Sequence, residues 1–218
     1  MSKLPINQII HGDCLEVMKS FPDKSIDLVL TDPPYGIGLA KGTITTYGQS
    51  IDKGRRYEGD WDNATPSKEY FDEMLRVGKN VVIFGGQFFT DKLPVNGHWV
   101  VWDKKGDIQF DNPFGDCELI YTNVNRKSVK KYTVIQQGFI TEDKSPRLHP
   151  TQKPVSLMEK LVEEYSEEGG VVLDPFSGSC TTCAAAISLK RNYICIEREE
   201  KYANVCLERL QTTTAPMF

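Results

Sequence analysis

The fold of this 218-residue chain is decided near its C-terminal end, where residues 171–182 read VVLDPFSGSCTT. The apolar residues predict a buried strand, the middle of the segment predicts a tight turn, and the residues that follow predict a helix. This order is typical of cofactor-binding α/β proteins, because Gly178 allows close backbone approach and Asp174 can accept hydrogen bonds from a cationic amine. A purely structural turn is the alternative for the segment taken alone.

Short β-branched runs alternate with helical patterns along the chain, which predicts an α/β fold with a doubly wound, mostly parallel sheet. The expected strands are residues 26–31, 81–84, 99–102, 118–121, 171–173 and 193–196, and the expected helices are residues 65–77, 155–166, 184–189 and 203–210. No repeat or linker divides the sequence, so we expect a single domain over residues 1–218. Residues 36–60 and 123–148 lack a period, and loops of that length are typically functional or disordered.

A second motif, TDPPYG at residues 31–36, directly follows an expected strand. Its two prolines have no N–H, so the loop mainly offers acceptors, among them the Asp32 carboxylate and the Pro33 carbonyl. With the ring of Tyr35 beyond Pro34, the motif matches a planar base that carries an amino group. A turn capped by an aspartate is the alternative, and the complete string at the end of a strand disfavours it.

Glu197 ends the next expected strand, about twenty residues beyond the Gly178 turn, where an acidic side chain can hold two ribose hydroxyls. The sequence has neither a GxGxxG pattern nor a phosphate-binding Lys-Ser/Thr pair at this turn. These features favour a cofactor that carries a ribose but no pyrophosphate.

Charge is unevenly distributed, since the chain has a formal net charge of -4 while residues 123–148 hold six basic and two acidic side chains. A basic segment on an acidic chain is typical of one nucleic-acid-binding face, and a solvated loop is the alternative. The candidate DNA-binding residues in this segment are Arg126, Lys127, Lys130 and Lys131. Lys53, Arg55 and Arg56 join them from the glycine-containing segment 36–60, which we expect to act as a mobile lid.

Six cysteines are scattered through a chain that has neither a signal-peptide core near its start nor an apolar run long enough to span a membrane. These features predict reduced thiols and a cytoplasmic protein. Cys180 and Cys183 have the spacing of half a zinc or redox site, but no second pair accompanies them in sequence. We therefore expect no bound metal.

Four strings, in this order, resemble those of the β-class DNA amino-methyltransferases: GDCLEVM at 12–18, TDPPY at 31–35, HPTQKP at 149–154 and DPFSGSCTT at 174–182. Weaker similarities at 84–86 and 102–104 extend the resemblance over nearly the whole chain. It implies a seven-stranded sheet of the S-adenosylmethionine-dependent methyltransferase type with a circularly permuted motif order. It also implies DNA as the partner, a homodimer, and a bacterial or phage-encoded enzyme.

The resemblance assigns roles to individual residues. The catalytic motif would be Asp32, Pro33, Pro34 and Tyr35. Cofactor contacts would come from Asp13 to the adenine amino group, from Glu197 to the ribose, and from Asp174, Phe176, Gly178, Ser179, Thr151 and Lys153 to the methionine half. Cys180 departs from the family pattern, which usually has glycine there, so the turn is expected to be less permissive.

The aspartate at position 32 favours the N6 amino group of adenine as the target, because the cytosine N4 enzymes more often have serine there. Cytosine N4 methylation is the closest alternative, and a catalytically silent DNA-binding module is the alternative from a different class. Residues 123–148 would be a minimal target-recognition segment, with a small hairpin of 132–134 against 139–141. So short a segment predicts a short or degenerate recognition site.

Overall fold

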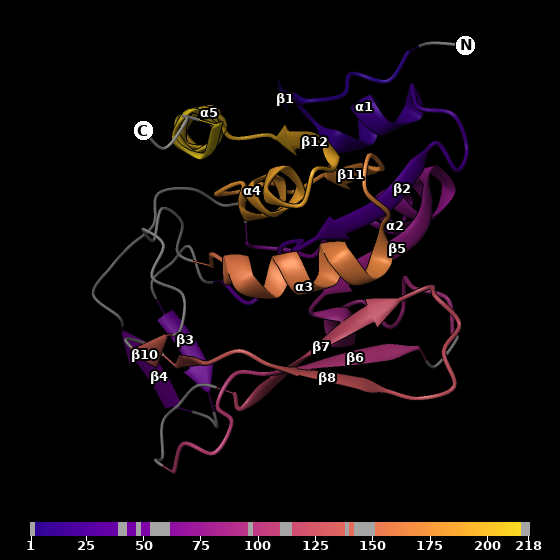
Figure 1. Cartoon of the computed structure of the whole chain (residues 1–218). Helices are drawn as coiled ribbons and strands as arrows, with labels where there is room; N and C mark the ends of the chain where they lie inside the picture. The colour runs from indigo at the N-terminus through magenta and orange to yellow at the C-terminus, as the bar shows by residue number, and fades with distance from the viewer. Residues whose placement is uncertain are drawn as a thin grey trace.

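The computed structural model describes residues 3–38, 43–46, 49–52, 62–95, 98–109, 115–137, 140–141 and 151–214. Its centre is an eight-stranded sheet in the order β1-β12-β11-β2-β5-β7-β6-β8, and helices cover both faces (Figure 1). The predicted α/β class and the doubly wound, mostly parallel sheet are confirmed.

The strands of the sheet, in spatial order, are β1 (Gln8–His11), β12 (Asn192–Glu197), β11 (Val171–Asp174), β2 (Ile26–Thr31), β5 (Gly78–Phe84), β7 (Cys117–Thr122), β6 (Trp99–Asp103) and β8 (Lys130–Thr133). Strand β7 is antiparallel to both of its neighbours, and every other pairing in this sheet is parallel. Five of the six residues of β2 are buried, as expected for a parallel strand between two helical layers.

The order of the motifs in the chain differs from their order in the sheet. Strand β2, which carries the TDPPY motif, comes early in the sequence, and β11, which carries the DPFSGS turn, comes late. The two strands nevertheless pair directly, with Leu173 opposite Val29. This is the circularly permuted arrangement that the motif order predicts.

The sheet has eight strands rather than the expected seven, because β8 extends it beyond β6. The packing explains the addition, since Tyr132 and Val134 lie in the same apolar cluster as Trp102, and the indole N–H of Trp102 donates to the Val134 carbonyl at 2.9 Å. The predicted hairpin of 132–134 against 139–141 is therefore wrong. A smaller hairpin pairs β9 (Gln136–Gln137) with β10 (Ile140–Thr141).

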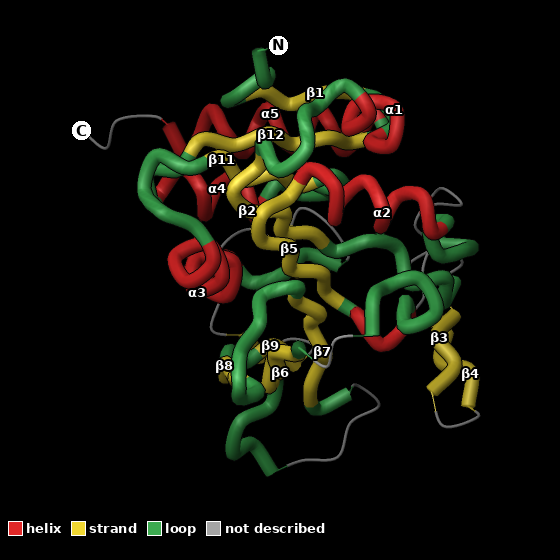
Figure 2. Tube along the Cα trace, turned by 90° about the vertical axis from the view of Figure 1, so that its right-hand side faces the viewer, coloured by secondary structure: helices red, strands yellow, loops and turns green. Residues whose placement is uncertain are grey.

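Two helical layers enclose the sheet, as Figure 2 shows with α2 and α3 on opposite sides of β5. Helices α1 (Cys14–Lys19) and α2 (Lys68–Val77) pack together, while α3 (Val155–Tyr165), α4 (Thr181–Ser188) and α5 (Glu200–Thr214) form the other layer. Each layer buries its own apolar cluster against the sheet. In the part of the chain described above, no helix combines the length and the apolar character that a membrane span needs.

Several boundaries differ from the sequence-based expectation. Helix α2 begins at Lys68 instead of residue 65, because Ser67 has extended backbone angles and precedes the first helical turn. The short elements β1 and α1 were not expected, since neither is long enough to show a clear apolar period. Within residues 36–60, strands β3 (Thr43–Thr46) and β4 (Gln49–Asp52) form a separate hairpin beside the sheet.

The expectation of reduced thiols is wrong for two of the cysteines. Cys183 on α4 and Cys195 on β12 form a disulfide, with their Cα atoms 6.8 Å apart. The sequence did not indicate this pair because the contact arises only when the helix packs on its neighbouring strand. Cys14, Cys117 and Cys180 are free, as is Cys206.

Asn123 holds the end of the β5–β7 pairing with its side chain, because its Oδ1 accepts the Val81 N–H at 2.8 Å and its Nδ2 donates to the Lys79 carbonyl at 3.0 Å. We predict that Asn123→Ala lowers the free energy of unfolding by about 1–3 kcal/mol, since it leaves a strand N–H without its acceptor. Urea denaturation measures the change. Asn63→Ala at an exposed position is the control, and equal effects in the two variants would contradict the prediction.

Candidate active site

The carboxyl ends of five parallel strands, β1, β12, β11, β2 and β5, lie along one edge of the sheet. Four of these ends carry an acidic side chain at or just beyond the last strand residue, in the spatial order Asp13, Glu197, Asp174 and Asp32. Ligands of open α/β sheets bind outside this edge. The fold therefore gathers the candidate residues from both ends of the sequence into one site.

Asp174 is buried at the end of β11 and accepts three hydrogen bonds. The Thr31 and Thr182 hydroxyls donate to its two oxygens at 2.7 and 2.5 Å, and the Phe176 N–H donates at 3.1 Å. Burial outweighs these bonds and raises the pKa of Asp174 to about 6. A cationic group bound here would favour the ionised carboxylate, as expected for a residue that contacts a cationic amine.

Glu197 holds the glycine turn in addition to its predicted contact with a ribose. Its two oxygens accept the Gly178 and Glu199 N–H groups, each at 2.8 Å. Burial raises the pKa of Glu197 despite these bonds. A carboxylate oxygen can accept more than one hydrogen bond, so the Glu197 side chain retains capacity for hydroxyl donors.

Asp13 lies beside the same turn and caps helix α1. One of its oxygens accepts the Leu15 N–H at 2.8 Å, and the other accepts the Tyr70 hydroxyl at 2.9 Å. The Tyr70 ring packs against Phe176 at a centroid distance of 6.1 Å. Two of the predicted cofactor contacts, Asp13 and Phe176, are thus joined through Tyr70.

The turn after β11 is strained at the position where the sequence departs from the family pattern. Cys180 has φ 62°, in the left-handed region that favours glycine, and directly precedes helix α4. A non-glycine residue there costs roughly 1–2 kcal/mol. Ser179 beside it is buried, so the predicted cofactor turn is tightly enclosed.

Asp32, just beyond the end of β2, lies in a cluster with Lys153 and Tyr35. The Lys153 ammonium is 2.5 Å from one Asp32 oxygen, and the Tyr35 hydroxyl donates to the other at 2.5 Å. Glu118 on β7 completes the cluster, 2.6 Å from the Tyr35 hydroxyl and 3.5 Å from the Lys153 ammonium. Lys153, which the sequence assigned to the cofactor, thus contacts the catalytic motif, while Thr151 lies half-buried two residues before it.

Burial and charge have opposing effects on the groups of this cluster. The Tyr35 hydroxyl lies within hydrogen-bond distance of both carboxyl groups, and its single proton can be donated to one of them at a time. Burial raises the pKa of Asp32, against the opposing effect of Lys153. Burial alone would lower the pKa of Lys153, but Asp32 and Glu118 together raise it. The cluster thus places two carboxyl groups around one buried lysine.

The Tyr35 ring is held in place on two sides. It stacks on Phe88 with a centroid distance of 4.8 Å, and the Lys153 ammonium lies 5.4 Å from its centroid. Gly85, with φ 64°, provides the room, because a Cβ there would overlap the ring. Phe88 itself is 38% exposed and places a second aromatic side chain beside the catalytic motif.

The candidate DNA-binding residues differ in their surroundings. Arg126 and Lys130 both pair with Glu164 on α3, and Lys131 is 3.1 Å from Asp103. Lys127 is exposed. Lys53, Arg55 and Arg56 lie outside the described residues, so the structure does not test whether they join this group.

Sequence reasoning missed three residues that build the site: Glu118, Tyr70 and Asp62. Asp62 fixes the end of the TDPPYG loop, since its side chain accepts the Gly36 N–H at 2.9 Å. Glu118 begins an expected strand, but only the antiparallel direction of β7 brings that end beside the carboxyl end of β5. Strand direction is a tertiary property, so no local signal marked this residue.

Comparison with known proteins identifies the family. The N6/N4 DNA methylase family matches residues 100–208. The type II methyltransferase M.HinfI of Haemophilus influenzae is 30% identical over 94% of this chain and 68% of its own length. The putative methylase YubD of Escherichia coli (strain K12) is 29% identical over 97% of this chain and 93% of its own length. The chain belongs to the N6/N4 DNA methylase family.

Solved structures share the fold. The M1.HpyAVI–SAM complex superposes with a TM-score of 0.62 at 22% identity, covering 93% of this chain and 98% of that one. PvuII DNA methyltransferase, described as cytosine-N4-specific, superposes with a TM-score of 0.60 at 17% identity, covering 93% of this chain and 85% of that one. TTHA0409 of Thermus thermophilus, complexed with S-adenosyl-L-methionine, superposes with a TM-score of 0.56 at 21% identity, covering 96% of each chain. These similarities confirm the methyltransferase fold.

The raised pKa of Asp174 predicts a pH-dependent cost of folding. Its folded pKa of about 6 exceeds the ordinary value of 3.8, so the native state binds the proton more tightly than the unfolded state. Stability from this group is therefore present at low pH and is lost as pH rises from about 4 to 6, by about 3 kcal/mol.

We predict that Asp174→Asn becomes progressively more stable relative to wild type across that interval, with a constant difference above it. Urea unfolding at a series of pH values, without added ligand, measures this. Asp91→Asn, at an exposed position, is the control. A stability difference for Asp174→Asn that does not change with pH would contradict the prediction.

Proposed function

We propose that this protein transfers the methyl group of S-adenosylmethionine to the exocyclic N6 amino group of adenine in DNA. One observation carries the proposal: Asp174 and Asp32 lie at the ends of paired strands, and the hydroxyl of Thr31, the residue before Asp32, donates to Asp174. Asp174 suits the cationic cofactor, and Asp32 suits an uncharged amine. Membership of the DNA methylase family agrees with this division.

The residues around the glycine turn fit the cofactor. Asp174 is a buried acid whose ionised form a cation would stabilise, and Glu197 offers acceptor capacity to ribose hydroxyls. Asp13 is the candidate acceptor for the adenine amino group, beside the aromatic side chains of Tyr70 and Phe176. Bound S-adenosylmethionine supplies a methyl group activated by the positive sulfur.

The target amine would be oriented by acceptors, because its lone pair is delocalised into the ring and makes it a weak nucleophile. Asp32 and the Pro33 carbonyl accept its two hydrogens and leave the nitrogen aimed at the methyl group. The amine takes the place of Lys153 on Asp32. Glu118, which already lies 3.5 Å from the Lys153 ammonium, keeps that charge paired.

Methylation leaves one proton to remove from the target nitrogen, as the new N–C bond forms and the S–C bond breaks. Asp32 is the acceptor in contact with that nitrogen. The Tyr35 hydroxyl connects Asp32 to Glu118, so the proton passes along a short chain of hydrogen bonds. Lys104 lies 3.8 Å from Glu118 and places a positive charge at the end of this chain.

Base flipping accompanies this chemistry, because a duplex buries the amino nitrogen and extrusion costs a few kcal/mol. Aromatic stacking returns roughly 1–3 kcal/mol per base, and Tyr35 with the exposed Phe88 supplies aromatic surface beside the motif. In the described part of the short segment 123–148, β8 joins the main sheet and β9 pairs with β10 over two residues, which supports recognition of a short or degenerate site. A homodimer, as the family resemblance implies, is tested by sedimentation equilibrium.

Adenine is favoured over cytosine by the aspartate of the TDPPY motif. Nucleoside mass spectrometry decides the base directly, after DNA is incubated with the enzyme and the cofactor and then digested. We expect N6-methyladenine. If N4-methylcytosine is the sole product, the target base is cytosine, and the assignment as an amino-methyltransferase still holds. If no methylated nucleoside forms, the result favours a catalytically silent DNA-binding module.

We predict that Asp32→Asn lowers kcat by a factor of about 100 to 10,000, because it removes the carboxylate that orients the amine and accepts its proton. Cofactor affinity should stay close to wild type, since the Asp174 side of the site is unchanged. Single-turnover kinetics and calorimetry measure the two effects, and circular dichroism checks folding. Asp91→Asn is the matched control, and wild-type turnover in Asp32→Asn would contradict the proposed mechanism.

We expect a basic residue that already pairs with a carboxylate of the protein to contribute less to DNA binding than an exposed one. We predict that Lys127→Ala lowers the slope of log K against log salt by about one, equally for all DNA sequences. Lys131→Ala should change it less, because Lys131 pairs with Asp103, whose pKa of about 2 reflects a Gly106 N–H bond and this lysine. Fluorescence anisotropy at several salt concentrations measures the slopes, with Lys19→Ala as control. An unchanged slope for Lys127→Ala would argue for a solvated loop.

A further inference from the structure

Four of the six cysteines meet beneath the cofactor turn. Cys180 precedes helix α4, Cys183 lies in its first turn, Cys195 is on β12 and Cys206 is on α5. All four are at most 1% exposed and form one small cluster. Their number and burial distinguish this cluster from isolated core cysteines, of which Cys14 is an example on the opposite layer.

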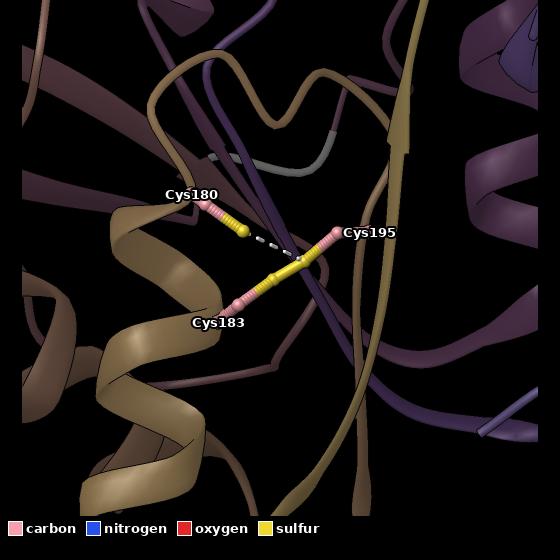
Figure 3. A group of neighbouring side chains, drawn as sticks. All are labelled: Cys180, Cys183 and Cys195. Carbon is pink, nitrogen blue, oxygen red and sulfur yellow. Dashed lines mark hydrogen bonds between the residues drawn. A yellow bond between two sulfur atoms is a disulfide. The ribbon is translucent and has the colours of Figure 1, made fainter. Parts of the chain in front are cut away.

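The sulfur atoms lie close enough to share one ligand. The sulfurs of Cys180, Cys183 and Cys195 all lie within 4.8 Å of one another, and the Cys180–Cys195 distance is 3.6 Å (Figure 3). Cys206 hydrogen-bonds with the Cys180 side chain and lies 3.4 Å from the Gly178 carbonyl. Cys206 thus approaches Cys180 from the side of α5, outside the group of three mutually close sulfurs.

The Cys180–Cys195 distance of 3.6 Å is close to that of a tetrahedral thiolate site, whereas Cys183 and Cys195 are bonded to each other in the disulfide form. Zinc–sulfur bonds of about 2.3 Å place the ligand sulfurs about 3.8 Å apart. The Cys180-x-x-Cys183 spacing is the usual one for a pair of ligands from one segment, and the second pair comes from β12 and α5. The sequence concealed that second pair because Cys206 lies 11 positions beyond Cys195.

The cluster lies at the N-terminal end of helix α4 and is enclosed by apolar side chains. The N-terminal turn of α4, which includes Cys183, presents backbone N–H groups and the positive end of the helix dipole. Leu210 and Tyr193 line the cluster with apolar surface, which excludes water from a bound ion.

We propose that the reduced chain binds one thiophilic divalent cation, Zn²⁺, through the sulfurs of Cys180, Cys183, Cys195 and Cys206. A dithiol reductant supplies the two electrons and two protons that convert the Cys183–Cys195 disulfide into two thiols. Zn²⁺ then replaces the four thiol protons, which are released to solvent. The disulfide form and the metal-bound form exclude each other because they use the same two sulfurs.

A cation here would support the cofactor turn without touching the reacting groups. Cys180 is the strained left-handed residue of that turn, and Cys206 contacts the Gly178 carbonyl. Cys195 is two residues before Glu197, which holds the Gly178 N–H. The site is independent of the proposed methyl transfer, since it concerns only the stability of the layer beneath it.

Cobalt substitution in the full-length protein tests the site. The chain is reduced with dithiothreitol, freed of metal, exchanged into anaerobic buffer without reductant, and checked for six free thiols. It is then titrated with Co²⁺ and Zn²⁺. We expect one Co²⁺ per chain, with the visible absorption and sulfur-to-cobalt charge-transfer bands of a tetrahedral thiolate site. Zn²⁺ should abolish these bands and raise the melting temperature.

Matched variants distinguish the cluster from adventitious binding. Cys183→Ser and Cys206→Ser should lose or strongly weaken the cobalt spectrum, whereas Cys117→Ser, at an exposed cysteine, should keep it. Circular dichroism of each metal-free variant verifies folding. The proposal is overturned if the fully reduced wild type binds no Co²⁺, if both cluster variants retain the spectrum, or if the disulfide resists reduction in the native chain.

Discussion

The parallel pairing of β11 with β2 is the constraint on which the rest of the site depends. It places the last residue of one strand, Asp174, beside the last residue of the other, so that Thr31 donates directly to the buried carboxylate. The cofactor motif and the catalytic motif thus meet across a single strand spacing. Without that pairing, residues that lie 143 positions apart in the chain would share neither a hydrogen bond nor an active site.

Charge is balanced differently on the two sides of this contact. Around Asp32, a lysine, a tyrosine and a second carboxyl group form a closed hydrogen-bonded cluster. Around Asp174, only uncharged hydroxyl and N–H donors compensate for burial, and the negative charge of Asp32 adds to the cost. The site is therefore matched to a cation on one side and to a neutral amine on the other, and folding bears the electrostatic cost of that arrangement.

The turn between these sides is rigid for several local reasons. Glu197 holds the Gly178 N–H from β12, and Cys206 approaches the Gly178 carbonyl from α5. The left-handed conformation of Cys180 is maintained because its side chain is fully enclosed by the cysteine cluster. Packing thus substitutes for the conformational freedom that glycine gives this position in related turns.

The sequence by itself determined the α/β class, the principal strands and helices, the two motifs and the family, because periodicity, turn chemistry and motif strings are local. It did not determine the place of Lys153 against Asp32, the membership of Glu118 in the catalytic cluster, or the eighth strand of the sheet. Nor did it predict that Cys195 and Cys206 would join the Cys180–Cys183 pair. These features were decided by the tertiary structure, because strand order, strand direction and helix packing bring side chains together that no sequence spacing relates.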